Sequence, residues 1–148
     1  YCSPMLRCKQ SAALLYPEIH PMILEGLREC DFGAFEGKNY HQLKDDSAYR
    51  EWLASGGKIS PPGGEEIQAF KDRCCQVFRQ AVNQSFRDKM ESVAFVTHGG
   101  VIMSILEYFG PSTKGFYDWQ VPNWGGWAIQ ERFYIWTEIE TLRDPRRI

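Results

Sequence analysis

The strongest constraint on the fold is a short apolar run that leads through a glycine pair into an apolar helical pattern. Residues 93–96, V-A-F-V, form the run, and residues 97–100, T-H-G-G, join it to the helical pattern of residues 101–109. An uninterrupted apolar run of this length is typical of a parallel strand that is covered on both faces. The whole stretch therefore predicts a strand, a tight turn and a buried helix in succession.

Helical and extended patterns alternate along the rest of the chain. A helix is expected from about Pro4 to Leu15, where Ser3 can cap its start, and the clearest helical stripe runs from about Glu65 to Phe86. We expect an edge strand over 19–24 and a loop over 25–38. A helical region is expected over 39–54, where residues 45–47 can break the helix and cap a new one. A final extended stretch is expected over 128–138. This alternation predicts an α/β layered fold, with residues 1–148 forming one domain.

Composition argues against several classes of protein. The 148 residues carry 17 basic and 19 acidic side chains, and the resulting net charge of −2 gives no reason to expect a nucleic-acid or membrane surface. The five cysteines are odd in number and show no C-x-x-C spacing, which favours a reducing, cytoplasmic compartment over a disulfide framework. No Cys, His and acidic residues cluster at metal-ligand spacing, so we do not expect a metal site.

His98 has the most informative position in the sequence. It stands at the carboxyl end of the expected strand and precedes two glycines at a helix start. Ligands of open α/β sheets bind at this edge, and free amides at a helix start attract anions, so His98 and the Gly99 amide are candidate ligands of an anion. The alternative is a buried core histidine beside a tight turn. On these residues alone the two interpretations carry equal weight.

Four strings in register resemble the histidine phosphatase superfamily, also called phosphoglycerate mutase-like: YCSPMLRCKQSA, LRECDFGAFEGK, PPGGEE and VAFVTHGGVIMSIL. Within that superfamily they most resemble short bacterial phosphatases such as α-ribazole phosphatase. The resemblance covers residues 1 to about 110 and implies a three-layer helix/sheet/helix fold. It also implies that Arg7 and Gly99 bind the substrate phosphate, that His98 is the second catalytic histidine and that Glu29 is the proton donor.

The insert that follows Glu29 is where the family places its substrate specificity. On that resemblance Tyr40 and Trp52 are expected to line a lid over the substrate, although aromatic side chains at such positions most often serve packing. Glu36 is a rival for the acid role, but its place before Gly37 favours a turn function.

The sequence departs from the family at the nucleophile. In the family this residue is a histidine in an R-H-G motif, upstream of the segment that Ser3-Pro4 matches, and the chain lacks that motif. The expected fold is therefore a phosphoglycerate mutase-like domain that is truncated at its N-terminus and lacks its first strand and helix. Without that strand, residues 93–96 have an unpaired edge. We expect the chain to be unstable alone, to pair with another chain, for example as a homodimer, or to come from a longer protein.

The implied function is hydrolysis of a small phosphorylated metabolite through a phosphohistidine intermediate. Arginine and histidine supply the positive charge, so no metal or cofactor is needed. Without the nucleophile, the chain by itself is expected to be inactive. One alternative is a phosphoglycerate mutase, whose members usually carry a longer insert between the acid and the second histidine. Another is a non-catalytic phosphate-binding or interaction domain.

Overall fold

The computed structural model of the chain describes residues 1–129 and 145–147. Contacts divide the chain into two compact units, the first made of residues 1–29 and 73–148 and the second of residues 30–72. Among the described helices, none combines the length and the apolar character that a membrane span requires.

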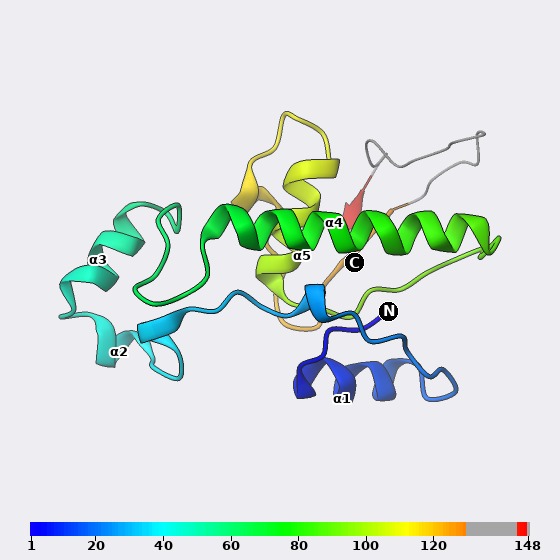
Figure 1. Cartoon of the computed structure of the whole chain (residues 1–148), viewed down its shortest axis with the longest axis horizontal. Helices are drawn as coiled ribbons and strands as arrows, with labels where there is room; N and C mark the ends of the chain where they lie inside the picture. Colours follow the sequence, from blue (N-terminus) through cyan, green and yellow to red (C-terminus); the bar gives the residue numbers. More distant parts are fainter. Residues whose placement is uncertain (130–144, 148) are drawn as a thin grey trace. The chain divides into compact units, whose positions relative to one another are not determined.

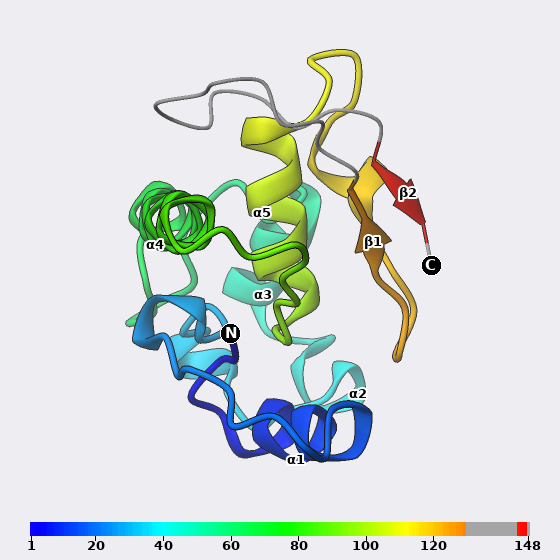
Figure 2. The ribbon, with the colours of Figure 1, turned by 90° about the vertical axis from the view of Figure 1, so that its right-hand side faces the viewer.

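The first unit consists of helices, 3-10 turns and short extended segments (Figures 1 and 2). Its helices are α1 (Leu6–Leu15), α5 (Gly99–Phe109) and the greater part of α4 (Ile67–Arg87). Its 3-10 turns are η1 (Glu25–Leu27) and η3 (Phe116–Trp119). Two short strands, β1 (Trp127–Ala128) and β2 (Arg146–Arg147), pair antiparallel with Trp127 opposite Arg147. In Figure 2, α5 runs between α4 and this strand pair.

Three extended segments lie parallel around Cys2, although each is shorter than a regular strand. Cys2 forms parallel bridges with Ile23 on one side and with Val96 on the other. The N–H of Cys2 donates to the Met22 carbonyl, and the N–H of Ser3 donates to the Val96 carbonyl, each at 2.9 Å. Both predicted strand regions therefore flank the same N-terminal segment, as expected of a parallel α/β core, but the regular strand pairing is shorter than predicted.

The segment that ends at Val96 is paired on one side. Ala94 and Val96 share backbone hydrogen bonds with residues 1–3. The backbone N–H and carbonyl of the intervening Phe95 face the opposite side, where no other described segment pairs with them. This side of the segment is an open sheet edge within the described part of the chain.

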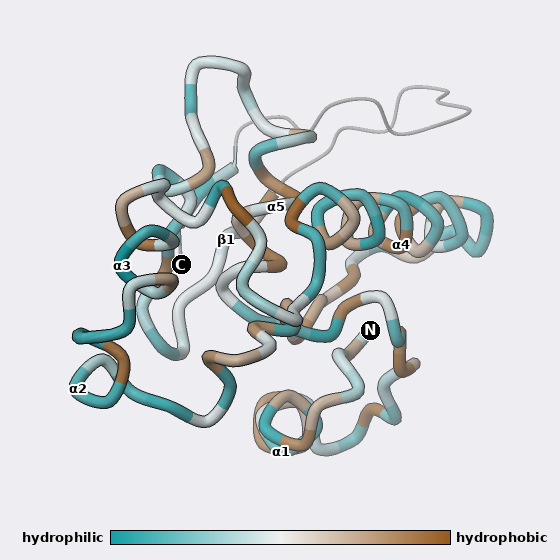
Figure 3. Tube along the Cα trace, turned by 60° about the vertical axis from the view of Figure 1, so that its left-hand side comes forward, coloured by the Kyte–Doolittle hydropathy of each residue, from teal (hydrophilic) through white to brown (hydrophobic). Residues whose placement is uncertain are grey.

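The helices α4 and α5 pack their apolar faces into one core. The sequence predicts helices over 65–86 and 101–109, and the structure confirms both, with shifts of about two residues at their starts. The ring of Phe78 on α4 lies 4.9 Å from that of Phe95 and 5.4 Å from that of Phe109 on α5, centre to centre. The tube of α4 alternates between hydrophilic and hydrophobic colours in Figure 3, as an amphipathic helix does.

The start of α1 differs from the prediction. The sequence predicts that Ser3 caps a helix beginning at Pro4, but α1 begins at Leu6, and Met5 is an N-cap residue without a side-chain cap bond. The Ser3 hydroxyl lies 3.4 Å from the Met5 N–H and only 2.7 Å from the ring of His98. The prediction was wrong because the hydroxyl has a better, buried partner from a distant part of the chain.

The second unit is a small helical unit around an aromatic cluster. Its elements are η2 (Gly33–Phe35), α2 (Tyr40–Leu43), α3 (Ser47–Ala54) and the start of α4. Asp46 caps α3 by accepting a hydrogen bond from the Tyr49 N–H at 3.1 Å, which confirms that the predicted break carries a cap. The cluster of rings consists of Phe32, Phe35, Tyr49 and Trp52.

The C-terminal extended stretch is described only in part. Trp127 and Ala128 form β1, so a strand is present where the predicted region of residues 128–138 begins. Residues 130–138 of that prediction lie outside the described residues.

Candidate functional site

His98 lies where the extended segment ending at Val96 passes into α5. It is the N-cap residue of α5, and only 6% of it is exposed. The hydroxyl of Ser3 lies 2.7 Å from Nε2 of His98, and Nε of Arg7 donates to Nδ1 at 3.1 Å. A guanidinium can only donate, so Nδ1 is the unprotonated ring nitrogen. The ring proton therefore sits on Nε2 and is donated to the Ser3 hydroxyl.

Burial and positive charge keep His98 neutral. Burial first, and then the charges of Arg7 and Arg73, lower the pKa of His98 from 6.5 to about 4. At neutral pH the ring is thus an uncharged acceptor for Arg7. A bound anion would change this balance, because negative charge beside an imidazole favours its protonated form.

Arg7 presents unused donors beside His98. It lies in the first turn of α1 and is exposed. Its Nε is bonded to His98, whereas neither of its two terminal nitrogens has a hydrogen-bond partner among the residues that the structure describes. A guanidinium in this state can hold two oxygens of a phosphate or carboxylate group at once.

The start of α5 adds backbone donors next to His98. The helix has 11 residues, and no side chain at its N-cap bonds to the N–H groups of its first turn. A Cβ built on Gly99 would meet no atom within 4 Å. Packing therefore does not require a glycine here, and space is left in front of the helix start. Free amides and the helix dipole both favour an anion in that space.

Glu29 follows η1 in the same unit and is half-buried. Its backbone carbonyl accepts a hydrogen bond from Nη2 of Arg73 at 3.2 Å. Burial above all raises the pKa of the Cys8 thiol, and the negative charge of Glu29 contributes to the same rise. Cys8 Sγ in turn lies 3.5 Å from Nε2 of His98. The Glu29 carboxylate is therefore within electrostatic range of the group around His98.

The sequence did not reveal two of the closest neighbours of His98. The sequence predicts Ser3 as a helix cap and assigns no role to Cys8, yet the Ser3 hydroxyl lies 2.7 Å from Nε2, and Cys8 contacts both ring nitrogens at 3.5 and 3.7 Å. The signal for Ser3 is the parallel register: once Cys2 pairs with Val96, the next residue lies beside the turn that carries His98. The contact of Cys8 with His98 cannot be predicted from the sequence, because it forms only when α1 is folded.

The other predicted residues belong to the second unit. Oε1 of Glu36 accepts a hydrogen bond from the Phe32 N–H at 2.8 Å, which is the turn function that the sequence favours. Trp52 packs against Phe35 and Tyr49 in the aromatic cluster, with ring centres 6.0 and 5.8 Å away. Tyr40 is 59% exposed. Trp52 thus has a packing role in its own unit, and a lid formed by Tyr40 and Trp52 stays a prediction.

Taken together, the groups around His98 are of the kinds that can bind an anion. They combine an open guanidinium end, free helix amides and a neutral imidazole that can take up a proton. Across residues 1–129 and 145–147, no three His, Cys, Asp or Glu side chains are grouped so as to hold a metal ion.

Known proteins resemble the chain in sequence. A model of the histidine phosphatase superfamily, branch 1, matches residues 1–130. The chain is 27% identical over 120 residues to "Phosphoglycerate mutase-like protein 4" of Arabidopsis thaliana, which covers 77% of this chain and 51% of that protein. It is 28% identical over 110 residues to "Putative phosphoserine phosphatase 2" of Hydrogenobacter thermophilus, which covers 72% of this chain and 52% of that protein. The chain thus spans about half the length of these curated relatives.

The fold of the chain is similar to that of a protein of known structure. The α-ribazole phosphatase of Shigella flexneri superposes with a TM-score of 0.66 at 24% identity, over 82% of this chain and 61% of that chain. A likeness at this level of identity shows the fold. The predicted phosphoglycerate mutase-like α/β fold is thereby confirmed.

Proposed function

Because the chain belongs to the histidine phosphatase superfamily, we propose that its site serves the hydrolysis of phosphate monoesters through a phosphohistidine intermediate. The observation that carries this proposal is the open guanidinium end of Arg7 beside the neutral imidazole of His98 and the uncapped start of α5. A phosphate dianion needs fixed donors of these kinds gathered in one place.

Each member of the group has a role in holding the phosphate. Arg7 holds two phosphate oxygens, and the Gly99 amide donates to a third. Phosphate binds the two terminal nitrogens of Arg7, and the dianion favours a proton on Nδ1 of His98, which displaces the hydrogen bond that Nδ1 accepts from Nε of Arg7. His98 then donates to the phosphate. Charge stabilisation and positioning of this sort account for most of the catalysis in phosphoryl transfer.

Glu29 is the proposed proton donor. A nucleophilic histidine attacks phosphorus, the bond from phosphorus to the leaving oxygen breaks, and Glu29 protonates that oxygen. Water then attacks the phosphohistidine while Glu29 takes up its proton. This second step frees the histidine and releases inorganic phosphate.

The nucleophile is not assigned to a residue of this chain. The other histidines, His20 and His41, precede proline and glutamine, so neither stands in an R-H-G motif. We therefore propose that these 148 residues by themselves bind phosphate without hydrolysing esters. The activity of the whole protein on a small phosphorylated metabolite is part of the same proposal.

A phosphoglycerate mutase is the second candidate, supported by the name of the Arabidopsis relative. The compact interval between Glu29 and His98 argues for the phosphatase. Faster isomerisation of phosphoglycerate than hydrolysis of a generic phosphate ester would favour the mutase.

A non-catalytic phosphate-binding domain is the third candidate. Turnover of a phosphate ester by this chain, if the variant His98→Ala abolished it, would exclude this candidate.

The cellular setting and the lid also belong to this proposal. None of the five cysteines, all of which lie in the described part of the chain and are buried, forms a disulfide, which supports a reducing, cytoplasmic location. For the lid, a Trp52→Ala variant should change the relative affinities for different phosphate esters. Unchanged affinities for several esters would remove the lid from the proposal.

Titration with inorganic phosphate, followed by NMR of labelled histidine rings, tests the phosphate site. We expect saturable shifts of the His98 signals and at least about tenfold weaker binding in Arg7→Gln, since a hydrogen bond to a charged group contributes about 1.5–3 kcal/mol. Arg79→Gln is the matched control and should bind like the wild type, because Arg79 donates to the Tyr108 hydroxyl and lies over the ring of Phe109. No saturable shift in the wild-type chain would overturn the proposal.

A further inference from the structure

Arg73 on α4 binds the backbone that leads to Glu29. Its Nη1 donates to the carbonyl oxygens of Gly26 and Arg28, both at 2.9 Å, and its Nη2 donates to the Glu29 carbonyl at 3.2 Å. One planar guanidinium thus holds three carbonyl groups that lie close together in the sequence. Because the donor directions of a guanidinium are rigid, it also fixes the positions of these carbonyls relative to one another.

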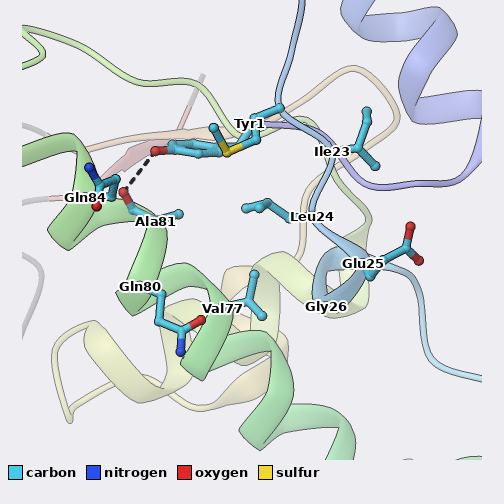
Figure 4. A pocket seen from close by; sticks show the side chains of 10 residues that line it. Tyr1, Ile23, Leu24, Glu25, Gly26, Val77, Gln80, Ala81 and Gln84 are labelled. Carbon is cyan, nitrogen blue, oxygen red and sulfur yellow. Dashed lines mark hydrogen bonds between the residues drawn. The ribbon is translucent and has the colours of Figure 1, made fainter. Parts of the chain in front are cut away.

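Close packing of η1 against α4 makes this contact possible. A Cβ on Gly26 would lie 2.3 Å from Cγ2 of Val77, so only glycine fits without a shift. Val77 lies one turn beyond Arg73, on the same face of α4. Gly26, Val77 and Leu24 line a groove of about 380 Å³, and Figure 4 labels all three.

A second anchor ties the same segment to the neighbour of His98. The hydroxyl of Thr97 donates to the Leu27 carbonyl at 2.9 Å. The backbone of residues 26–29 is therefore held from α4 by Arg73 and from the end of the extended segment by Thr97. This segment carries Glu29 at one end and is tied to the residue before His98.

We propose that Arg73 is a positioning residue of the phosphate site: it fixes the backbone of residues 26–29 so that Glu29 faces the phosphate that Arg7 and His98 hold. The inference rests on the proposed function and adds a residue to it. Arg73 also acts on the site through its charge, since after burial and Arg7 it contributes to the lowered pKa of His98.

Two variants separate the shape of Arg73 from its charge. Arg73→Lys keeps the positive charge and loses the planar fork, whereas Arg73→Gln loses both. Arg79→Gln is the matched control, because it removes a half-buried arginine from the same helix, where its hydrogen bond goes to the Tyr108 hydroxyl.

Hydrogen exchange measures the anchoring directly. The amides of Leu27 and Arg28 bond to the carbonyls of Leu24 and Glu25, so they report whether the segment keeps its shape. Measured against the amides of α5, the exchange rate of these two amides should rise about tenfold or more in both Arg73 variants. In Arg79→Gln the same rate should not change. Unchanged exchange in both Arg73 variants would overturn the inference.

The pKa of His98 separates positioning from charge. It should rise in Arg73→Gln, which removes a positive charge, and stay low in Arg73→Lys, which keeps one. A rise in both variants, or in neither, would contradict the division of roles proposed for Arg73. Hydrogen exchange and this titration need no ligand, so they decide the inference even if the proposed function fails.

A double-mutant cycle tests whether Arg73 acts through Glu29, with inorganic phosphate as the probe. Arg73→Lys should change phosphate affinity by about threefold or more in the wild-type background and by less than about twofold in Glu29→Gln. Equal effects in the two backgrounds would mean that Arg73 only supports the fold and would contradict the inference. Failure of the wild-type chain to bind phosphate would instead refute the proposed function.

Discussion

At the scale of single residues, the chemistry of His98 is set by side chains that lie more than ninety positions away in the sequence. Ser3, which is 95 positions away, accepts the proton on Nε2, and Arg7, which is 91 positions away, occupies Nδ1. Together with burial, the guanidinium makes a charged ring unfavourable. The resting state of the site is therefore a neutral histidine and an arginine with unused donors, ready for an anion.

The low pKa of His98 predicts a pH-dependent stability. In the folded chain this pKa is about 4, against 6.5 as the ordinary value. As the pH falls below 6.5, the unfolded chain binds a proton that the folded chain does not accept until about pH 4. The stability due to neutral His98 is therefore complete above pH 6.5 and is lost towards pH 4, by an amount on the order of 3 kcal/mol.

Urea unfolding at neutral pH and near pH 4, compared between the wild type and His98→Gln, measures this contribution. Paired carboxylates lose stability in acid in both proteins, so their effect cancels in the difference. The wild type should lose more stability than the variant. Equal losses in the two proteins would contradict the pKa of His98 and the buried, neutral state that it describes.

Gly99→Ala separates packing from ligand binding. A methyl group at this position meets no protein atom within 4 Å, and alanine favours a helix more than glycine does, so stability should be unchanged or higher by up to about 1 kcal/mol. The methyl group would occupy space in front of the first-turn amides, so phosphate should bind more weakly. Thermal unfolding and phosphate titration of the same variant check both halves. Unchanged phosphate affinity would remove Gly99 from the site.

At the scale of elements, the helices with long apolar stripes could be predicted and the short extended segments could be predicted only in part. The stripes of α4 and α5 pack into one core through Phe78 and Phe109, so the pattern and the structure agree. The strand regions around Ile23 and Val96 were found, but their pairing amounts to single bridges to Cys2. Pairing depends on partners distant in sequence, which a local pattern does not contain.

The same reason explains what was predicted of the site. Arg7 and His98 stand in recognisable strings, so both could be named from the sequence. Their mutual contact, and the contacts of Ser3 and Cys8 with the ring, arise only when α1 folds beside the start of α5. The role of Arg73 could not be predicted from the sequence, because its partners are backbone carbonyls. Every residue has such a carbonyl, so the side-chain pattern does not indicate which ones Arg73 binds.

Gly26→Ala tests the packing of η1 against α4. The added methyl group would lie 2.3 Å from Cγ2 of Val77, so the turn must shift, at a cost of about 1–3 kcal/mol. Val77→Ala removes the clashing atom and should recover part of this loss in the double variant. Chemical denaturation of both single variants and the double variant measures the coupling. Additive losses would contradict the close contact between the turn and the helix.

At the scale of the whole molecule, the open edge at Phe95 predicts association. Its backbone N–H and carbonyl face a side where no described segment pairs with them, and open edges favour pairing with another chain. Sedimentation at increasing protein concentration should show dimers or larger species, as the sequence leads us to expect for a chain with an unpaired strand edge. A chain that stays monomeric at high concentration and unfolds in one cooperative transition would contradict this prediction.

The most direct test of the account is the pKa of His98 with and without inorganic phosphate, measured by NMR titration of the labelled ring. Without phosphate the pKa should be about 4. With saturating phosphate it should rise by at least about one unit, because a dianion held by Arg7 beside the ring favours the imidazolium form. A pKa that phosphate leaves unchanged would show that His98 and Arg7 do not form a phosphate site.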